Sequence, residues 1–248
     1  QIKVMAGGGV ASNYDPIDVT QYTVPEIRAA VEAADNWGTY VTVHAYTPKA
    51  VRQAIEAGVK CIDHGQMLDE DTARLMAEKG VWWSLQPFTD DRKSPFPEGS
   101  ANRLKQLEMY KGTDHAYAMA KKYGIKTAFG TDALFSAQAA ASQGTMLAKM
   151  GTWYTPAEVL RMATHDNAEL LALSGPRSPY PGRLGVVEAG ALADLLLLGL
   201  VTAPEPVLLK LGIKYIALLL RMDDLGGLHR RSRQRAGPPA ARHRRVGA

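Results

Sequence analysis

The sequence predicts an α/β fold built on a parallel sheet, and two observations lead to that prediction. Five short apolar or β-branched runs alternate with helical patterns between Gln1 and about Gly151, an order that requires crossover connections and parallel strands. Polar residues recur where nearly every run ends. This favours a TIM-type (β/α)8 barrel facing one pocket over a doubly wound sheet, which also fits the pattern. A complete barrel has eight strands, so about three would precede those visible here.

The first strand and the first helix are separated by a glycine-rich loop. QIKVM (1–5) is strand-like, and AGGGVAS follows it. Residues 18–37 contain a helical pattern in which Pro25 suits the first turn and Gly38 the end. Because QIKVM is typical of a barrel strand with nothing before it, we expect the natural N-terminus to lie upstream.

The next two units repeat the order of strand, turn and helix. TYVTVHA (39–45) is β-branched and strand-like. TPKAVRQAIEAG (47–58) is a short helix, with threonine as N-cap, proline at the first position and glycine past the end. VKCIDHG (59–65) is the next strand, and LDEDTARLMAEKG (68–80) is the next helix.

Two further strands complete the series. VWWSLQP (81–87) is the fourth, and a polar loop (88–100) follows it. A single long helix is predicted over 102–123. IKTAFGTD (125–132) is the last strand and ends in a carboxylate.

Helical patterns and a small β appendage follow Asp132. The helices are predicted at 137–151, 156–163 and 166–174. PGRLGVVEAGALADLLLL (181–198) predicts two short strands around a turn, the remnant of a β-sandwich.

The chain therefore divides into a barrel body (1–175), a β return segment (176–199) and an atypical tail (200–248). The formal net charge of +4 conceals a mildly acidic body and a strongly basic tail. Residues 228–248 have no apolar periodicity and are rich in Arg, Gly, Pro and Ala. That composition predicts a disordered segment, and the abrupt change also suggests out-of-frame translation.

Composition limits the cellular setting. No uncharged apolar run reaches the roughly 18 residues of a membrane-spanning helix, since the most apolar late segment (207–220) contains Lys210 and Lys214. The single cysteine, Cys61, excludes an intrachain disulfide and fits a reducing compartment. No signal peptide opens the chain. We therefore expect a cytoplasmic protein without a membrane partner.

Four polar residues at or near strand ends suggest a metal site. They are Lys3, His44, His64 and Asp132. Neutral imidazoles and carboxylates ligate divalent ions such as Zn²⁺, and a carboxylate can also accept the proton of an activated water. A lone histidine on a strand is more often structural, but two in equivalent positions of neighbouring strands favour ligation. Lys3 could be a Schiff-base nucleophile, a buried ion-pair partner or, once carbamylated by CO₂, a bridging carboxylate.

These motifs, in this order, resemble a known family. QIKVMAGGGV, VTVHAY, CIDHG and FGTDA, followed by GRLGVVEAGALADLLLL, are similar to the second half of the amidohydrolase superfamily. The nearest branches are the imidazolonepropionase-like and the Xaa-Pro dipeptidase (prolidase-like) enzymes. The resemblance covers about 1–198 and implies barrel strands four to eight.

The resemblance also implies roles for individual residues and one or two divalent metals, with Zn²⁺ the expected ion. Lys3 would be the carbamylated bridging ligand on strand four. His44 and His64 would be ligands on strands five and six. Asp132, on strand eight, would be a ligand and the proton shuttle, and Tyr46 would polarise the substrate carbonyl.

One part of the family pattern is missing. The His-x-His pair of strand one does not occur in 1–199, so this chain should hold an incomplete site and has the character of a fragment. His115 lies within a helical pattern and His165 at a helix junction, where structural roles are expected. His229 and His243 lie in the basic tail without site context.

The leading hypothesis is a metal-dependent hydrolase of amide or C–N bonds in a dipeptide, an Xaa-Pro substrate or an N-acyl amino acid. A one-metal cyclic amidohydrolase, which does not need the lysine, is an alternative. Two other classes remain open: a phosphate-binding protein using AGGG (6–9) as an anion nest, and nucleic-acid binding by the Arg-rich tail. An open barrel edge would invite pairing with another chain, so a homo-oligomer is possible.

Overall fold

The computed structural model describes residues 1–90, 94–134 and 137–192. All of them belong to one of the two compact units into which the chain divides. The predicted basic tail (200–248) and the end of the β return segment lie outside the described residues.

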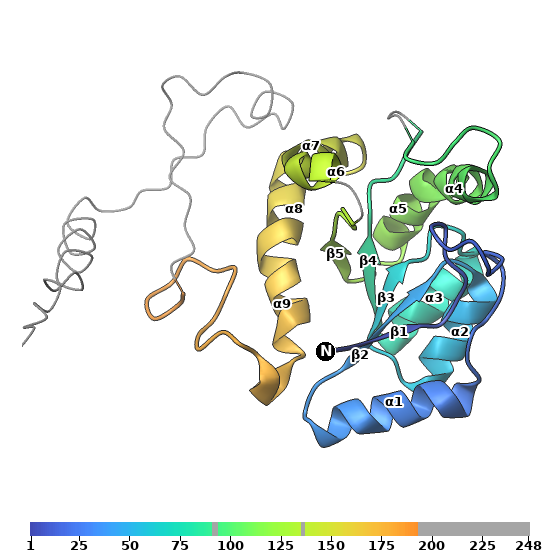
Figure 1. The fold of residues 1–248 in the computed structure, drawn as a ribbon. Coiled ribbons are helices and arrows are strands. Elements are labelled where there is room, and N and C mark those ends of the chain that lie inside the picture. Colours follow the sequence, from blue (N-terminus) through green and yellow to red (C-terminus); the bar gives the residue numbers. More distant parts are fainter. Residues whose placement is uncertain (91–93, 135–136, 193–248) are drawn as a thin grey trace, which may run out of the picture. The chain divides into compact units, whose positions relative to one another are not determined.

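The strands form one parallel sheet in which spatial order follows chain order. They are β1 (Ile2–Met5), β2 (Val41–Ala45), β3 (Cys61–His64), β4 (Trp82–Leu85) and β5 (Thr127–Phe129) (Figure 1). A doubly wound sheet reverses its strand order at a switch point, whereas this sheet runs from β1 to β5 without reversal. The architecture is therefore that of a partial barrel, as the sequence predicts.

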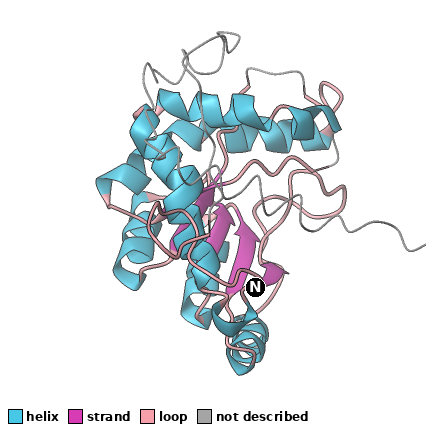
Figure 2. Ribbon diagram, turned by 90° about the vertical axis from the view of Figure 1, so that its left-hand side faces the viewer, coloured by secondary structure: helices cyan, strands magenta, loops and turns pink. Residues whose placement is uncertain are grey.

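Helices connect and flank these strands, and Figure 2 shows them in cyan beside the magenta sheet. The helices are α1 (Val24–Asn36), α2 (Pro48–Ala57), α3 (Glu70–Lys79), α4 (Ala101–Lys111), α5 (Thr113–Lys122), α6 (Ala137–Ala141), α7 (Gln143–Lys149), α8 (Pro156–Arg161) and α9 (Asn167–Ala172).

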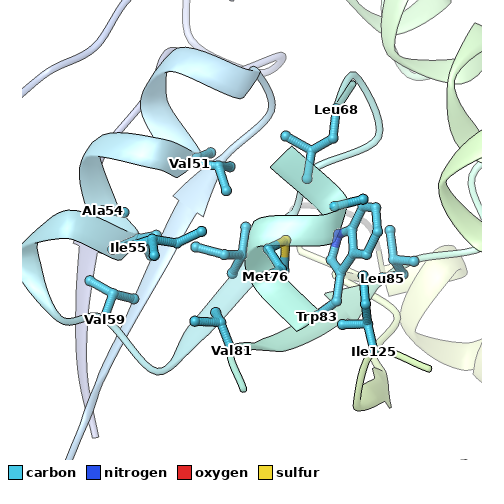
Figure 3. Close-up of a cluster of buried hydrophobic side chains, with 14 of the residues drawn as sticks. Val51, Ala54, Ile55, Val59, Leu68, Met76, Val81, Trp83, Leu85 and Ile125 are labelled. Atoms are coloured by element: carbon cyan, nitrogen blue, oxygen red, sulfur yellow. The ribbon is translucent and has the colours of Figure 1, made fainter. Parts of the chain in front are cut away.

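Alternation along the strands separates a helix-facing side from an inner side. Helix-facing residues such as Val43, Ile62 and Trp83 are fully buried against α1, α2, α3 and α5. Figure 3 shows Trp83 in this cluster beside Met76 of α3. On the inner side, Leu170 of α9 packs against a small apolar cluster, which consists of Tyr40, Cys61, Trp82 and Ala128. The inner side also carries polar residues, among them Lys3, His44 and Asp63.

Local signals explain the start and end of α2. Thr47 occupies the N-cap position with extended backbone, Pro48 is the first helical residue, and Gly58 ends the helix with a left-handed φ of 101°. The Thr47 hydroxyl makes no capping hydrogen bond, so Thr47 marks the start of the helix by its extended backbone alone. The predicted bounds of this helix are confirmed.

The predicted helix over 102–123 is wrong, because Gly112 divides it into α4 and α5. A Cβ added at Gly112 would lie 1.8 Å from the carbonyl oxygen of Gln66, in the loop after β3. The lack of a side chain at Gly112 allows the chain between α4 and α5 to approach that backbone. The first helical hydrogen bond of α5 runs from the Ala116 N–H to the Gly112 carbonyl at 2.9 Å. Helical periodicity cannot report this long-range contact.

Beyond Asp132, the connections between the helices differ from those that the sequence predicts. A 3₁₀ turn, η1 (Met150–Thr152), extends α7, and a π-helical turn, η2 (Met162–Asp166), joins α8 directly to α9. Residues 181–192 form turns and bends without a strand. The two strands predicted within 181–198 are thus not found in the described part of that segment, and 193–198 lie outside it.

Gly112→Ala is expected to destabilise the fold by about 1–3 kcal/mol, because the added methyl overlaps a backbone atom that cannot rotate away. Gly144→Ala is the control, since no heavy atom lies within 4 Å of its Cβ position on α7. There, alanine should stabilise by up to about 1 kcal/mol. Urea denaturation followed by circular dichroism measures both. Equal free energies of unfolding for the two variants would contradict this account of the junction.

Candidate functional site

An ion pair crosses the inner side of the sheet near the carboxyl ends of the strands. The Lys3 ammonium on β1 lies 2.8 Å from Oδ2 of Asp63 on β3. β2 lies between these strands, and its inward residue His44 is in register with Asp63. The Lys3 side chain is 49% exposed and that of Asp63 is 16% exposed. The amine is therefore accessible, while its partner is largely buried.

Two imidazoles meet at the ends of β2 and β3. The ring centroids of His44 and His64 are 4.6 Å apart in an edge-on arrangement. His44 faces inward by strand alternation. Regular alternation after Asp63 would direct His64 towards the helices. Its φ of 78° is instead in the left-handed region, and with this departure from strand geometry the His64 ring lies beside that of His44.

The backbone at two of the predicted ligands is strained. Within the described part of the chain, His64 (φ 78°) and Asp132 (φ 46°) are the non-glycine residues with left-handed φ. Such a conformation costs of order 1 kcal/mol or more, and it concentrates at functional sites. The strain is thus an independent indication that the positions of these two side chains matter.

Hydrogen bonds to oxygen acceptors set the tautomer of each histidine. Nε2 of His44 lies 3.0 Å from the Gly8 carbonyl oxygen, and Nδ1 of His64 lies 2.7 Å from Oε1 of Gln86. The Gln86 amide is oriented by its own Nε2, which donates to the Ser84 carbonyl at 2.9 Å. Because both acceptors lack a proton, these ring nitrogens are the donors. The lone pairs are left on Nδ1 of His44 and Nε2 of His64.

Both imidazoles are buried in the neutral form. Burial lowers the pKa of His44 below its ordinary value, although the Gly8 carbonyl opposes this by favouring the charged ring. Burial lowers the pKa of His64 to about 3, and the neighbouring His44 acts in the same direction. Neutral imidazole is the form that binds metals.

Tyr46 packs against both rings. Its ring stacks on His64 with centroids 4.9 Å apart, and it meets His44 edge-on at 5.0 Å. The residue is 3% exposed, and burial raises the pKa of the phenol well above its usual range, with the charge of Asp132 adding to the effect. The hydroxyl of Tyr46 therefore remains a neutral donor.

Asp132 follows β5 in a loop and remains accessible to solvent. Partial desolvation raises the pKa of its carboxyl group; Lys3 opposes this rise and Asp63 reinforces it. Two carboxylates thus share the field of one ammonium. A raised pKa brings an aspartate closer to the range in which it can exchange protons near neutral pH.

The geometry can be compared with the predicted ligand set. The structure brings His44 and His64 together and pairs Lys3 with Asp63. Within residues 1–90, 94–134 and 137–192, no three His, Cys, Asp or Glu side chains are grouped to hold a metal ion. The two imidazoles nevertheless fit a metal, because each presents one lone pair and donates its other N–H to a carbonyl, the usual arrangement of histidine ligands.

The structure adds two residues that the sequence interpretation overlooked. Asp63 holds Lys3, and Gln86 orients His64. The signal for Asp63 was present in CIDHG, since alternation puts it in register with His44 on the inner side. Gln86 comes directly after β4, at another strand end, and could have been found by the same rule.

The other histidines lie elsewhere. His115 is exposed on α5. His165 is in η2, where Nδ1 lies 3.0 Å from Oδ1 of Asp166. Both lie on helical segments and not at the strand ends, and His229 and His243 are outside the described residues.

The glycine-rich loop does not offer an anion nest. The amide N–H groups of Ala6 and Gly7 donate to the His44 carbonyl, and that of Gly8 donates to the Val19 carbonyl. The Gly9 N–H donates to Oδ2 of Asp15 at 2.7 Å. Since all four donors of AGGG are engaged within the chain, the phosphate-binding alternative loses its basis.

TIM-barrel enzymes keep their active sites at the carboxyl ends of the strands. This partial β/α barrel carries imidazole, carboxylate and amine groups at those ends, so it belongs to that class of fold. The chain belongs to the amidohydrolase family: the family model, described as "Amidohydrolase family", matches residues 1–219. This agrees with the resemblance carried by the strand-end motifs.

Several members of the family are similar to this chain in sequence or structure. The chain is 31% identical to ochratoxinase of Aspergillus niger over 190 residues, covering 74% of this chain and 38% of that protein. A prolidase structure in complex with N-methylphosphonate-L-proline is 33% identical, with a TM-score of 0.68, over 77% of this chain and 46% of that one. A Xaa-Pro dipeptidase with bound methionine is 30% identical, with a TM-score of 0.66, over 77% and 47%.

The chain thus spans less than half the length of these relatives. In the part of the chain that the structure describes, no helix has the length and apolar character needed to cross a membrane.

Proposed function

We propose that this chain contributes catalytic residues to a metal-dependent hydrolase that cleaves the amide bond of a small substrate, of the dipeptide, Xaa-Pro or N-acyl amino acid type. The observation that carries the proposal is the pair of neutral imidazoles held in complementary tautomers at adjacent strand ends. The names of the relatives, a prolidase, a Xaa-Pro dipeptidase and an ochratoxinase, support the substrate class.

The metal ligands would be Nδ1 of His44, Nε2 of His64 and the Asp132 carboxylate, with carbamylated Lys3 bridging where two ions are bound. A bound divalent cation such as Zn²⁺ supplies Lewis acidity towards water and the substrate carbonyl. Lys3 is accessible enough to react with CO₂, and carbamylation would require its release from Asp63. Gly8 and Gln86 orient the two imidazoles.

Two side chains would handle the substrate directly. Asp132, whose pKa is raised, accepts a proton from the attacking water and passes it to the leaving nitrogen as the C–N bond breaks. Tyr46 stays protonated, so its hydroxyl donates a hydrogen bond to the carbonyl oxygen as negative charge develops there.

The substrate is a small molecule, and a cytoplasmic location remains part of the proposal because the single cysteine, Cys61, is free and buried.

A one-metal cyclic amidohydrolase is a second candidate, and a specific observation favours it. Lys3 is paired as an ammonium with Asp63 at 2.8 Å, and an ammonium cannot ligate a metal. Lys3→Ala separates the two candidates. A one-metal enzyme would keep its metal, whereas a two-metal enzyme would lose part of it.

Metal analysis of the purified chain tests the proposal. We expect bound Zn²⁺, Mn²⁺ or Fe. We expect His44→Ala to lower the metal affinity by about 10-fold or more, and therefore to lower the metal content of the purified protein. The matched control is His115→Ala, which removes an exposed imidazole from α5 and should leave the metal content unchanged. Folded protein that binds none of these metals would contradict the proposed function.

A further inference from the structure

The loop after β1 is closed on itself. Gly7 pairs with Thr20 in an isolated antiparallel bridge, and the Gly8 N–H donates to the Val19 carbonyl at 3.3 Å. A Cβ on Gly8 would lie 1.8 Å from the carbonyl oxygen of Pro16, so only glycine permits the returning chain to pass there. The loop therefore has a defined shape whose interior is lined by backbone groups.

One side chain from a distant helix occupies that interior. The Lys105 ammonium on α4 donates to the carbonyl oxygens of Gly9 (3.2 Å), Ser12 (2.9 Å) and Asp15 (2.5 Å). An ammonium has three N–H groups, and all three are used on this loop. The contacts join residues 90 to 96 positions apart in sequence, so local structure alone cannot form them.

A second polar residue and an apolar contact complete the attachment. Nδ2 of Asn102, on the same helix, donates to the carbonyl oxygens of Val10 (2.8 Å) and Ser12 (3.0 Å). The Val10 side chain is buried in one cluster with Tyr46 and with Met109 of α4. The loop is thus attached to α4 on one side and to the site on the other.

The attached loop carries the carbonyl that orients His44. Gly8, which accepts from Nε2–H of His44 at 3.0 Å, immediately precedes Gly9, whose own carbonyl accepts from Lys105. A Cβ on Gly9 would lie 3.7 Å from Nε2 of His44. A movement of the loop at Gly9 would therefore move the acceptor that fixes the His44 tautomer.

We propose that Lys105 is a positioning residue: by filling the loop, its ammonium holds the Gly8 carbonyl against His44 and keeps the Nδ1 lone pair of that imidazole directed into the site. The Lys105 ammonium acts on the imidazole through these loop carbonyls. Its importance for a metal rests on the proposed function, but its effect on the tautomer does not, since that hydrogen bond exists without metal or substrate.

The test compares Lys105→Met with Lys111→Met. Methionine keeps most of the side-chain stem and removes every donor. The carbonyls of Gly9 and Asp15 then lose the Lys105 hydrogen bond, while that of Ser12 keeps its bond from Asn102. Lys111 lies on the same helix and pairs with Glu108 across one turn, at 2.7 Å on the surface. Both proteins are purified as the full chain, labelled with ¹⁵N-histidine and kept in chelator.

Ring ¹⁵N–¹H correlation spectra report the tautomers, with His44 assigned by its absence from His44→Ala. In the parent chain and in Lys111→Met, we expect His44 protonated on Nε2 and His64 on Nδ1. In Lys105→Met, we expect His44 to become a mixture of tautomers, with His64 unchanged. A wild-type His44 spectrum in folded Lys105→Met overturns the proposal. If that variant does not fold, Lys105→Gln takes its place under the same criterion.

Titration with Co²⁺ alone, followed by visible absorption, separates this inference from the proposed function. If the parent chain binds Co²⁺, Lys105→Met should bind it about 10-fold more weakly and Lys111→Met should not differ. Equal Co²⁺ affinity in all three overturns the positioning role. A parent chain that binds no Co²⁺ contradicts the proposed function and leaves the tautomer measurement to decide the role of Lys105.

Discussion

Asp132→Asn is expected to lower turnover of an Xaa-Pro dipeptide such as Gly-Pro by about 10²- to 10⁴-fold, because an amide cannot carry the proton from water to the leaving nitrogen. Asparagine preserves the shape of the side chain and tolerates left-handed backbone, which the φ of 46° at this position requires. Release of free proline measures the rate. Circular dichroism should show an unchanged fold.

Asp35→Asn is the matched control, since Asp35 is an exposed carboxylate in the last turn of α1. It should retain full turnover. Loss of activity in both variants would point to a general effect of net charge. Full activity in Asp132→Asn would exclude this carboxylate as the proton carrier and would leave the role to another group.

Trp83→Ala is expected to destabilise the fold by about 3–5 kcal/mol, the cost of removing a large buried aromatic side chain. Trp83 is fully buried in the cluster between the sheet and its helices (Figure 3). Its indole N–H also donates to the His64 carbonyl at 2.7 Å. The variant therefore loses core packing and, in addition, the bond that supports the strained backbone of His64.

Urea denaturation followed by far-ultraviolet circular dichroism measures the effect without relying on tryptophan fluorescence. Trp37→Ala is the control, since Trp37 is 64% exposed and should cost about 1 kcal/mol or less. Trp83→Phe keeps most of the aromatic packing and loses the donor, so a smaller cost of about 1–3 kcal/mol is expected. If Trp83→Ala cost no more than Trp37→Ala, the packing described for β4 would be wrong.

Much of the candidate site could be predicted because it depends on strand periodicity. Alternation along TYVTVHA puts His44 on the inner side, and the polar ends of successive parallel strands must share one edge of the sheet. Lys3 and His44 follow from that rule, whereas Tyr46 is expected only from the family resemblance. His64 does not, since alternation from Asp63 would direct it towards the helices, and its left-handed φ removes it from the regular pattern.

The partners of these residues could not be predicted, because each comes from another element. Gln86 reaches His64 from the end of β4, and Lys105 reaches the loop after β1 from α4. Gly112 ends a helical pattern that continues without interruption in the sequence, since the constraint is the Gln66 carbonyl of a different loop. Contacts between distant residues leave no periodic trace in the chain.

The sequence by itself determined the order of the five strands, the inner and outer sides of those strands, and the strand-end residues to which we assign the chemistry. These features depend on short-range periodicity and on the chemistry of single side chains. Only the tertiary structure decided the tautomers of His44 and His64, the pairing of Lys3 with Asp63 and the attachment of the glycine-rich loop. Each of these depends on distances between groups far apart in the chain, and those distances exist only once the elements have packed.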